Sequence, residues 1–306
     1  GKHSGVQNQQ FTDDKDKEDK YRQAAAACKD KEKQAYIASG GNEKDFEEDQ
    51  EAKALVAMDD ALELCVNNHE KITALTSAST DDEKSTAYET AYAACEGSAK
   101  EAVMKAGGDI TKMTQLEEKA NRGALKKSLE GCIESKLNQL TRAPTSDDYQ
   151  AFRKACDSKA QDEFRKKGGK LEDFEMQKQV AARDALKDMQ KAKVEAHEDV
   201  VNLAADADIA TKAAAYKKAS KAAEAEARAA FLKTGGDPDD FALQKEKAAR
   251  DALVDTQTAQ VNAHDKVKSL TANSDMETRI TAYKEAATAA KVAARDAYLK
   301  TGGDLD

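Results

Sequence analysis

Five double glycines, spaced almost evenly along the chain, constrain its fold more than any other feature of the sequence. Successive pairs lie 67, 61, 67 and 67 residues apart, and a tyrosine precedes the first glycine of every pair by 19 residues. Self-similarity at a fixed period is the sequence signature of a repeat architecture. The repeated positions are Gly40, Gly41, Gly107, Gly108, Gly168, Gly169, Gly235, Gly236, Gly302 and Gly303, with Tyr21, Tyr88, Tyr149, Tyr216 and Tyr283.

The segments between the double glycines have the pattern of helices. Alanine, the strongest helix former, fills 59 of the 306 positions, and small or apolar residues recur at spacings of three and four. Each double glycine predicts a helix end, because glycine adopts the left-handed conformation there without steric cost. Asn42, Asp109 and Asp237 follow three of the pairs and are expected to cap the next helix.

A second kind of joint lies midway between the glycine turns. Thr80 with Glu83, and Ser274 with Glu277, have the spacing of a capping box, in which each side chain caps the other residue's backbone. Pro144 marks the same joint in "RAPTSDDY", just outside a helix. Each repeat is therefore expected to hold a first helix of about 26 residues and a second of about 32.

These joints predict an all-α fold of tandem repeats of about 67 residues, each made of two antiparallel helices, that together form an elongated rod or solenoid. The expected parts are an N-terminal arm (1–12), repeats 1 to 4 (13–78, 79–143, 144–206 and 207–273) and a half repeat 5 (274–306) that contains a first helix and its turn.

The cysteine positions indicate which helices pair. An antiparallel hairpin brings together residues that are equally far from its turn. Cys65 and Cys95 each lie about 15 residues from a joint near residue 80, and Cys132 and Cys156 each lie about 12 from a joint near residue 144. We therefore expect disulfides Cys65–Cys95 and Cys132–Cys156, each joining the second helix of one repeat to the first helix of the next.

Two other interpretations of the cysteines stay open. Free cysteines in a helical core behave as small hydrophobic residues. Zinc ligation is disfavoured, because no CxxC-like spacing is present. Disulfides would indicate an oxidising compartment, so the protein is expected to be secreted.

Cys28 has no expected partner within the chain, because it occupies the position where a first helix should be bridged to an upstream second helix. At the other end, "TGGDLD" supplies a turn with no second helix after it. Two explanations are open: the sequence is a piece of a longer array, or subunits join head to tail through Cys28 or through contacts alone. A head-to-tail contact that does not close generates a filament.

Three of the four histidines share one repeat position, 29 residues after the first glycine: His69, His197 and His264, with Lys136 in the remaining repeat. Each is expected to approach the tyrosine of the next repeat and to fix the helix register. A metal site or a pH switch is the alternative. Acidic clusters at residues 12–19 and 237–240 could attract calcium, although the EF-hand spacing is absent and helix capping explains such residues.

Charge and motifs narrow the function. A net charge of −9 and a pI near 5.2 disfavour nucleic acid or an anionic membrane as a partner. No stretch is long and apolar enough to suggest membrane insertion, and no nucleotide-binding, hydrolase or metalloprotease motif occurs. We expect no cofactor and no metal. The first hypothesis is a non-enzymatic structural protein that self-associates into an extracellular filament, coat or matrix. The alternatives are a helical binding module, which carries an apolar ligand or docks a protein, and a cytosolic scaffold with free thiols.

Overall fold

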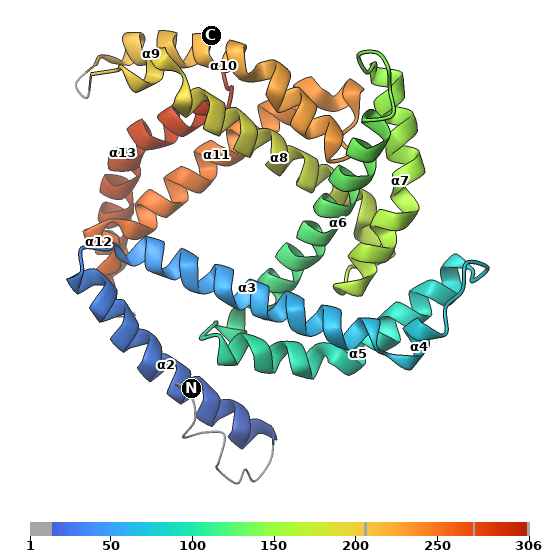
Figure 1. Cartoon of the computed structure of the whole chain (residues 1–306). Helices are drawn as coiled ribbons and strands as arrows, with labels where there is room; N and C mark the ends of the chain where they lie inside the picture. The colour runs from blue at the N-terminus through green and yellow to red at the C-terminus, as the bar shows by residue number, and fades with distance from the viewer. Residues whose placement is uncertain (1–13, 205–206, 272, 305–306) are drawn as a thin grey trace. The chain divides into compact units, whose positions relative to one another are not determined.

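The computed structural model describes residues 14–204, 207–271 and 273–304 (Figure 1). Within these ranges the chain is all helical and contains no strand, and its long helices pack as antiparallel pairs. The predicted arm at 1–12 lies outside the described residues, as does the side chain of Tyr21. The repeat boundaries expected from the sequence stay a prediction.

The helices follow one another with short connections. The long helices are α2 (Asp14–Ala38), α3 (Glu43–Asn67), α5 (Asp81–Lys105), α6 (Met113–Leu137), α7 (Ser146–Lys166), α8 (Phe174–Ala196), α10 (Ile209–Lys233), α11 (Phe241–Ala263) and α13 (Met276–Lys300). Single-turn helices lie between them: α4 (Glu70–Thr73), η1 (Ile110–Lys112), η2 (Leu171–Asp173), α9 (Glu198–Val201), η3 (Pro238–Asp240) and α12 (Asp265–Lys268).

All five double glycines end a helix in the same way. The first glycine of each pair has a positive φ, between 81° and 94°. Its N–H and that of the second glycine bond back to carbonyls in the last helical turn, as in Gly236 N to Phe231 O (2.9 Å). This is the Schellman motif, which needs a left-handed residue that glycine adopts most readily. We name these segments turns 1 to 5: residues 36–41, 103–108, 164–169, 231–236 and 298–303.

Most of the expected N-caps are present. Asn42 accepts a hydrogen bond from Asp45 N at 2.9 Å, and Asp109 and Asp237 cap η1 and η3. Thr80 and Glu83 form the predicted capping box at the start of α5.

The capping box expected at Ser274 and Glu277 is wrong. Asp275 is the N-cap of α13, and its carboxylate accepts from Thr278 N at 2.7 Å. Ser274 instead accepts a hydrogen bond from Thr271 N within the preceding loop. The carboxylate is the stronger acceptor, so it takes the capping position one residue later.

The second helix of a repeat is shorter than the expected length of about 32 residues. It stops after 25 or 23 residues, and a separate turn of four residues follows as α4, α9 or α12. His69, His197 and His264 stand at the break with an extended backbone. The sequence did not predict this break, because the segment contains no glycine or proline to mark it.

Each second helix pairs with the first helix of the following repeat. Helices α3 and α5 run side by side, as do α11 and α13 (Figure 1). The Cys132–Cys156 bond joins α6 to α7. Gln190, fully buried on α8, donates to the backbone and the hydroxyl of Ser220 on α10, both at 3.0 Å.

The chain forms two compact units. Unit 1 comprises residues 1–128 and 158–175, and its core lies between α3, α5 and the start of α6, where Met58, Leu62, Ala91 and Cys95 are fully buried. Unit 2 comprises residues 129–157 and 176–306. Alanine dominates its core, so helix axes approach closely while each residue buries little apolar area.

Candidate functional site

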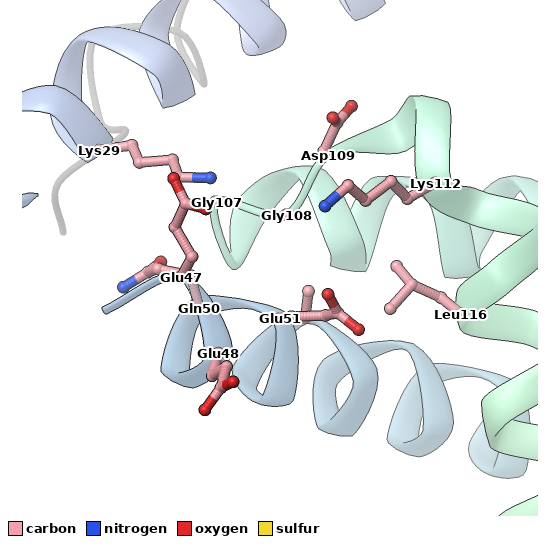
Figure 2. A pocket seen from close by; sticks show the side chains of 11 residues that line it. Lys29, Glu47, Glu48, Gln50, Glu51, Gly107, Gly108, Asp109, Lys112 and Leu116 are labelled. Carbon is pink, nitrogen blue, oxygen red and sulfur yellow. The ribbon is translucent and has the colours of Figure 1, made fainter. Parts of the chain in front are cut away.

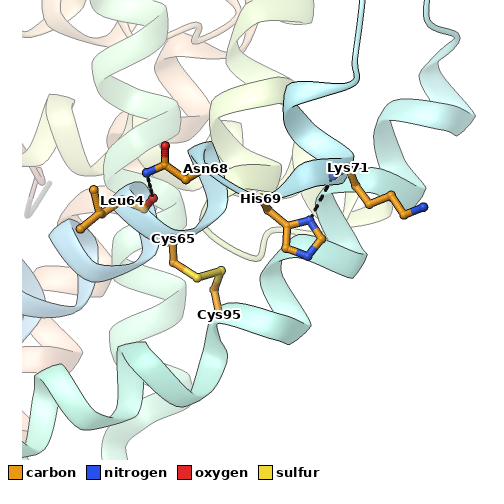
Figure 3. The surroundings of a disulfide bond; sticks show 6 residues. All are labelled: Leu64, Cys65, Asn68, His69, Lys71 and Cys95. Atoms are coloured by element: carbon orange, nitrogen blue, oxygen red, sulfur yellow. Dashed lines mark hydrogen bonds between the residues drawn. A yellow bond between two sulfur atoms is a disulfide. The ribbon is translucent and has the colours of Figure 1, made fainter.

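Two disulfides join helices at matching heights along their axes. Cys65 on α3 bonds Cys95 on α5 with a Cα–Cα distance of 5.7 Å (Figure 3). Cys132 on α6 bonds Cys156 on α7 with a Cα–Cα distance of 5.9 Å. These are the two pairs expected from their distances to the joint. Cys95 and Cys156 are fully buried, whereas Cys65 and Cys132 are partly exposed.

Cys28 on α2 is a free thiol and is partly exposed. Structural disulfides of this kind are typical of proteins in oxidising compartments.

Turn 3 docks on the α3·α5 pair of unit 1. Lys167, only 4% exposed, forms an ion pair with Asp59 at 2.7 Å and also donates to the Asp59 carbonyl at 3.0 Å. Gly168 lies against the ring of Tyr92 on α5, so a side chain at this glycine would meet the ring. Contacts to both helices fix the turn on the pair.

Turn 4 docks in the same way on α6 and α7 within unit 2. A Cβ at Gly235 would lie 2.9 Å from Leu129 Cδ1 and 3.3 Å from the Lys178 side chain. Lys233 forms an ion pair with Glu134 on α6 at 3.1 Å. Asp237, just after the turn, bonds Arg153 on α7 at 3.0 Å.

Turn 5 repeats this arrangement on α8 and α10. Lys300 forms an ion pair with Glu195 at 3.0 Å, which is the equivalent of the Lys233–Glu134 pair one repeat later. The Lys300 ammonium also lies 5.9 Å from the centre of the Tyr216 ring, in cation–π range. A Cβ at Gly302 would lie 3.2 Å from Ser220 Oγ.

Two of the repeated tyrosines lie where turns dock: Tyr88 beside turn 3 and Tyr216 beside turn 5. Tyr88, Tyr149 and Tyr216 are 6%, 9% and 6% exposed. Burial raises the pKa of Tyr88 to about 12 and also raises that of Tyr216. Tyr88 and Tyr216 therefore stay neutral near pH 7, and all three tyrosines act as buried packing residues.

The repeated histidines cap the single-turn helices. Nδ1 of His69 accepts a hydrogen bond from Lys71 N at 3.3 Å (Figure 3), and Nδ1 of His197 accepts from Asp199 N at the same distance. His264 occupies the same position without a side-chain cap bond. Lys136 cannot accept such a bond, and α6 continues through it to Leu137. Contact between each histidine and a tyrosine stays a prediction.

An open pocket of about 370 Å³ lies beside turn 2, between α2, α3 and η1 (Figure 2). Its charged lining is mixed: Lys29, Glu47, Glu48, Glu51, Asp109 and Lys112. The bond from Lys119 holds the pKa of Glu51 below its usual value. No group of three or more potential metal ligands occurs among the described residues. The carboxylates here are thus matched by lysines and caps.

A second pocket, of about 550 Å³, lies where turn 3 meets α5. Tyr88 and Tyr92 form one side, and Arg165 and Lys170 lie on the other. Arg165 is 3% exposed, and within the described part of the chain its Nε and Nη2 have no hydrogen-bond partner. The pocket is therefore a polar site beside two aromatic rings.

Comparisons of this chain with protein-family models, with curated proteins and with solved structures give no match. None of the described helices combines the length and apolar character needed to cross a membrane. The repeat pattern alone does not predict the docking of the turns, although one signal is present: lysine or arginine stands within three residues before four of the five double glycines.

Proposed function

We propose that this protein is a non-enzymatic structural building block, a disulfide-linked array of helix pairs that assembles head to tail into an extracellular filament, coat or matrix. One observation supports this above the others. Turns 3, 4 and 5 each dock on the helix pair before them through their first glycine, and turns 4 and 5 add an ion pair at equivalent repeat positions. A contact that recurs in one direction along a chain can continue from one chain to the next.

The finer architecture belongs to the same proposal. Helix pairs that contact mainly their neighbours in sequence form an elongated rod or solenoid rather than one central core. Alanine seams bury little apolar area per residue, so such an array has a small hydrophobic contribution to stability. Two disulfides offset this, each by roughly 3 to 4 kcal/mol for closed loops of this size.

The disulfides also support a location outside the cell. Structural disulfides persist in secreted proteins and are rare in the reducing cytosol. An extracellular coat or matrix exposes its subunits to proteases and mechanical load, and covalent links between helices resist both.

Sedimentation velocity of the purified chain over micromolar to millimolar concentrations tests the proposal. A building block is expected to form oligomers that grow with concentration and that shrink when a reductant opens the disulfides. A chain that sediments as a monomer at every concentration would contradict the proposed assembly.

The pocket beside Tyr88 and Arg165 favours a second candidate, a helical binding module. Its volume of about 550 Å³ lies in the range of small-molecule sites. Native mass spectrometry of the freshly purified chain separates the two: a carrier shows a bound small molecule that Arg165→Met removes. The remaining alternative, a cytosolic scaffold, requires five titratable thiols under denaturing, non-reducing conditions, whereas the disulfide-bonded chain has one.

A further inference from the structure

The α11·α13 pair exposes a face that the other helix pairs bury. Tyr283 on α13 is 48% exposed, whereas the tyrosines at its repeat position, Tyr88, Tyr149 and Tyr216, are 6%, 9% and 6% exposed. The equivalent tyrosines of the other repeats therefore show how exposed this position is when the face is covered. In the other pairs a glycine turn covers this position, and turns 3, 4 and 5 each dock on a different pair.

The exposed face continues along α11. Gln257 and Val261 are partly exposed, and Val254 is 57% exposed. We define the α11·α13 face as Val254, Gln257, Val261 and Tyr283. The residues at the repeat positions of Gln257 and Val261 are fully buried in the other pairs: Leu62, Val66, Leu129, Ile133, Gln190 and Val194.

One turn in the chain is correspondingly uncovered. Ile37 in turn 1 is 46% exposed, while the residues at its repeat position are 8%, 3%, 5% and 5% exposed: Met104, Arg165, Leu232 and Leu299. A Cβ at Gly40 would meet nothing within 4 Å, whereas each of the other four positive-φ glycines has a neighbour at that range. Within the described part of the chain, turn 1 thus has the shape of a docking turn without its contacts.

The charge pair that accompanies turns 4 and 5 is absent from both turn 1 and the α11·α13 face. Turns 4 and 5 carry lysine two residues before the glycine, and the receiving helix carries glutamate, as in Lys233–Glu134 and Lys300–Glu195. In turn 3, Lys166 instead pairs with Glu163 on its own helix, and the receiving helix has Asn67 at the glutamate position. Turn 1 has Ala38 at the lysine position, and α11 has Asn262 at the glutamate position. Because turn 3 docks on α3 without this charge pair, turn 1 does not need the pair in order to dock on α11.

We propose that turn 1 of one copy docks on the α11·α13 face of a second copy, with Ile37 against Tyr283 and Ser39 beside Val254. The placement follows turn 3, where Lys167 and Asp59 hold the positions of Ser39 and Val254 and lie 2.7 Å apart. This inference rests on the proposed function and names its contact surface. One turn covers far less than the roughly 1,600 Å² of a standard interface, so a single contact is weak and requires high concentration.

Cross-linking tests the placement directly. The chain with Ser39→Cys is mixed with the chain carrying Val254→Cys, both with Cys28→Ser, and treated with a short bismaleimide. Covalent dimers are expected only in the mixture. The matched control is Val292→Cys on α13, which is 58% exposed and stands at a repeat position that is exposed in every other described repeat. Equal yields with the control, or no dimer, would overturn the inference.

A charge-pair test adds a gain of affinity. Ala38→Lys in one chain and Asn262→Glu in the other recreate the pair seen at turns 4 and 5. The mixture is expected to associate several-fold more tightly than either variant alone, and salt is expected to remove the gain. In the opposite direction, Ile37→Asp is expected to weaken association roughly tenfold or more, because it buries a charge without a partner.

The outcomes separate this inference from the proposed function. If oligomers form normally but do not respond to Ile37→Asp, Tyr283→Asp or the charge pair, the proposed assembly stands and the proposed contact between turn 1 and the α11·α13 face is wrong. A chain that never oligomerises overturns both. A chain that carries both Ser39→Cys and Val254→Cys gives a further outcome. If it cross-links within itself and forms no dimer, turn 1 docks on the α11·α13 face of its own chain, and the proposal that a second copy docks there is wrong.

Discussion

Replacing Gly235 by alanine separates the two roles of a glycine turn. The substitution places a side chain at a φ of +85°, which costs roughly 1 to 2 kcal/mol for a non-glycine residue. Its Cβ would also lie 2.9 Å from Leu129 and 3.3 Å from Lys178, and overpacking of this kind costs roughly 1 to 3 kcal/mol. The expected loss of unfolding free energy is therefore roughly 2 to 5 kcal/mol.

Gly40→Ala is the matched control. Gly40 has a φ of +94° and makes the same Schellman hydrogen bonds, but a Cβ there meets nothing within 4 Å. Only the backbone cost of roughly 1 to 2 kcal/mol should remain. Urea unfolding followed by far-UV circular dichroism measures both variants, and hydrogen exchange around each turn localises the loss. If Gly235→Ala costs no more than Gly40→Ala, turn 4 is not docked and the reasoning is wrong.

Three further predictions concern the covalent and capping contacts. Replacing both Cys65 and Cys95 by alanine should cost roughly 3 to 4 kcal/mol in urea unfolding, and a reductant should then have a smaller effect on the variant than on the original chain. Backbone hydrogen bonds from the start of α10 lower the pKa of Asp208, so the carboxylate stabilises the fold above its unfolded pKa near 4 and stops doing so as pH falls. In the Asp208→Asn variant, the midpoint temperature of thermal unfolding should therefore depend less on pH between about pH 5 and 2. His197→Ala should cost about 1 kcal/mol by removing a cap, whereas His264→Ala, where no cap bond exists, should cost less in the same thermal assay.

Local chemistry made much of the fold predictable. Glycine pairs, Thr80 with Glu83, and Asn42 each act within a few residues, so their spacing specifies a turn or a cap. The cysteine pairing was also accessible, because two helices that leave one joint keep equal distances along their axes. The break of the second helix at the repeated histidines was not predictable from the sequence. The Nδ1 atom of histidine can accept a capping hydrogen bond, but histidine is seldom a strong enough cap to be recognised in a sequence.

The docking of the turns depends on contacts between residues far apart in sequence. Lys167 meets Asp59 across 108 positions, and spacing within one repeat gives no information on such a contact. The same holds for Tyr283, whose sequence position matches that of Tyr88 while its exposure does not. Periodicity identifies equivalent residues, and only the packing shows which of them are covered.

The central claim is that each second helix pairs with the first helix that follows it, and mass spectrometry of the chain digested without reduction tests this most directly. The account predicts a peptide pair linked through Cys65 and Cys95, a second pair linked through Cys132 and Cys156, and an alkylatable thiol at Cys28. A link between Cys95 and Cys132 would instead join residues across a glycine turn at unequal heights. That result, or five alkylatable thiols, would contradict the pairing of each second helix with the first helix that follows it.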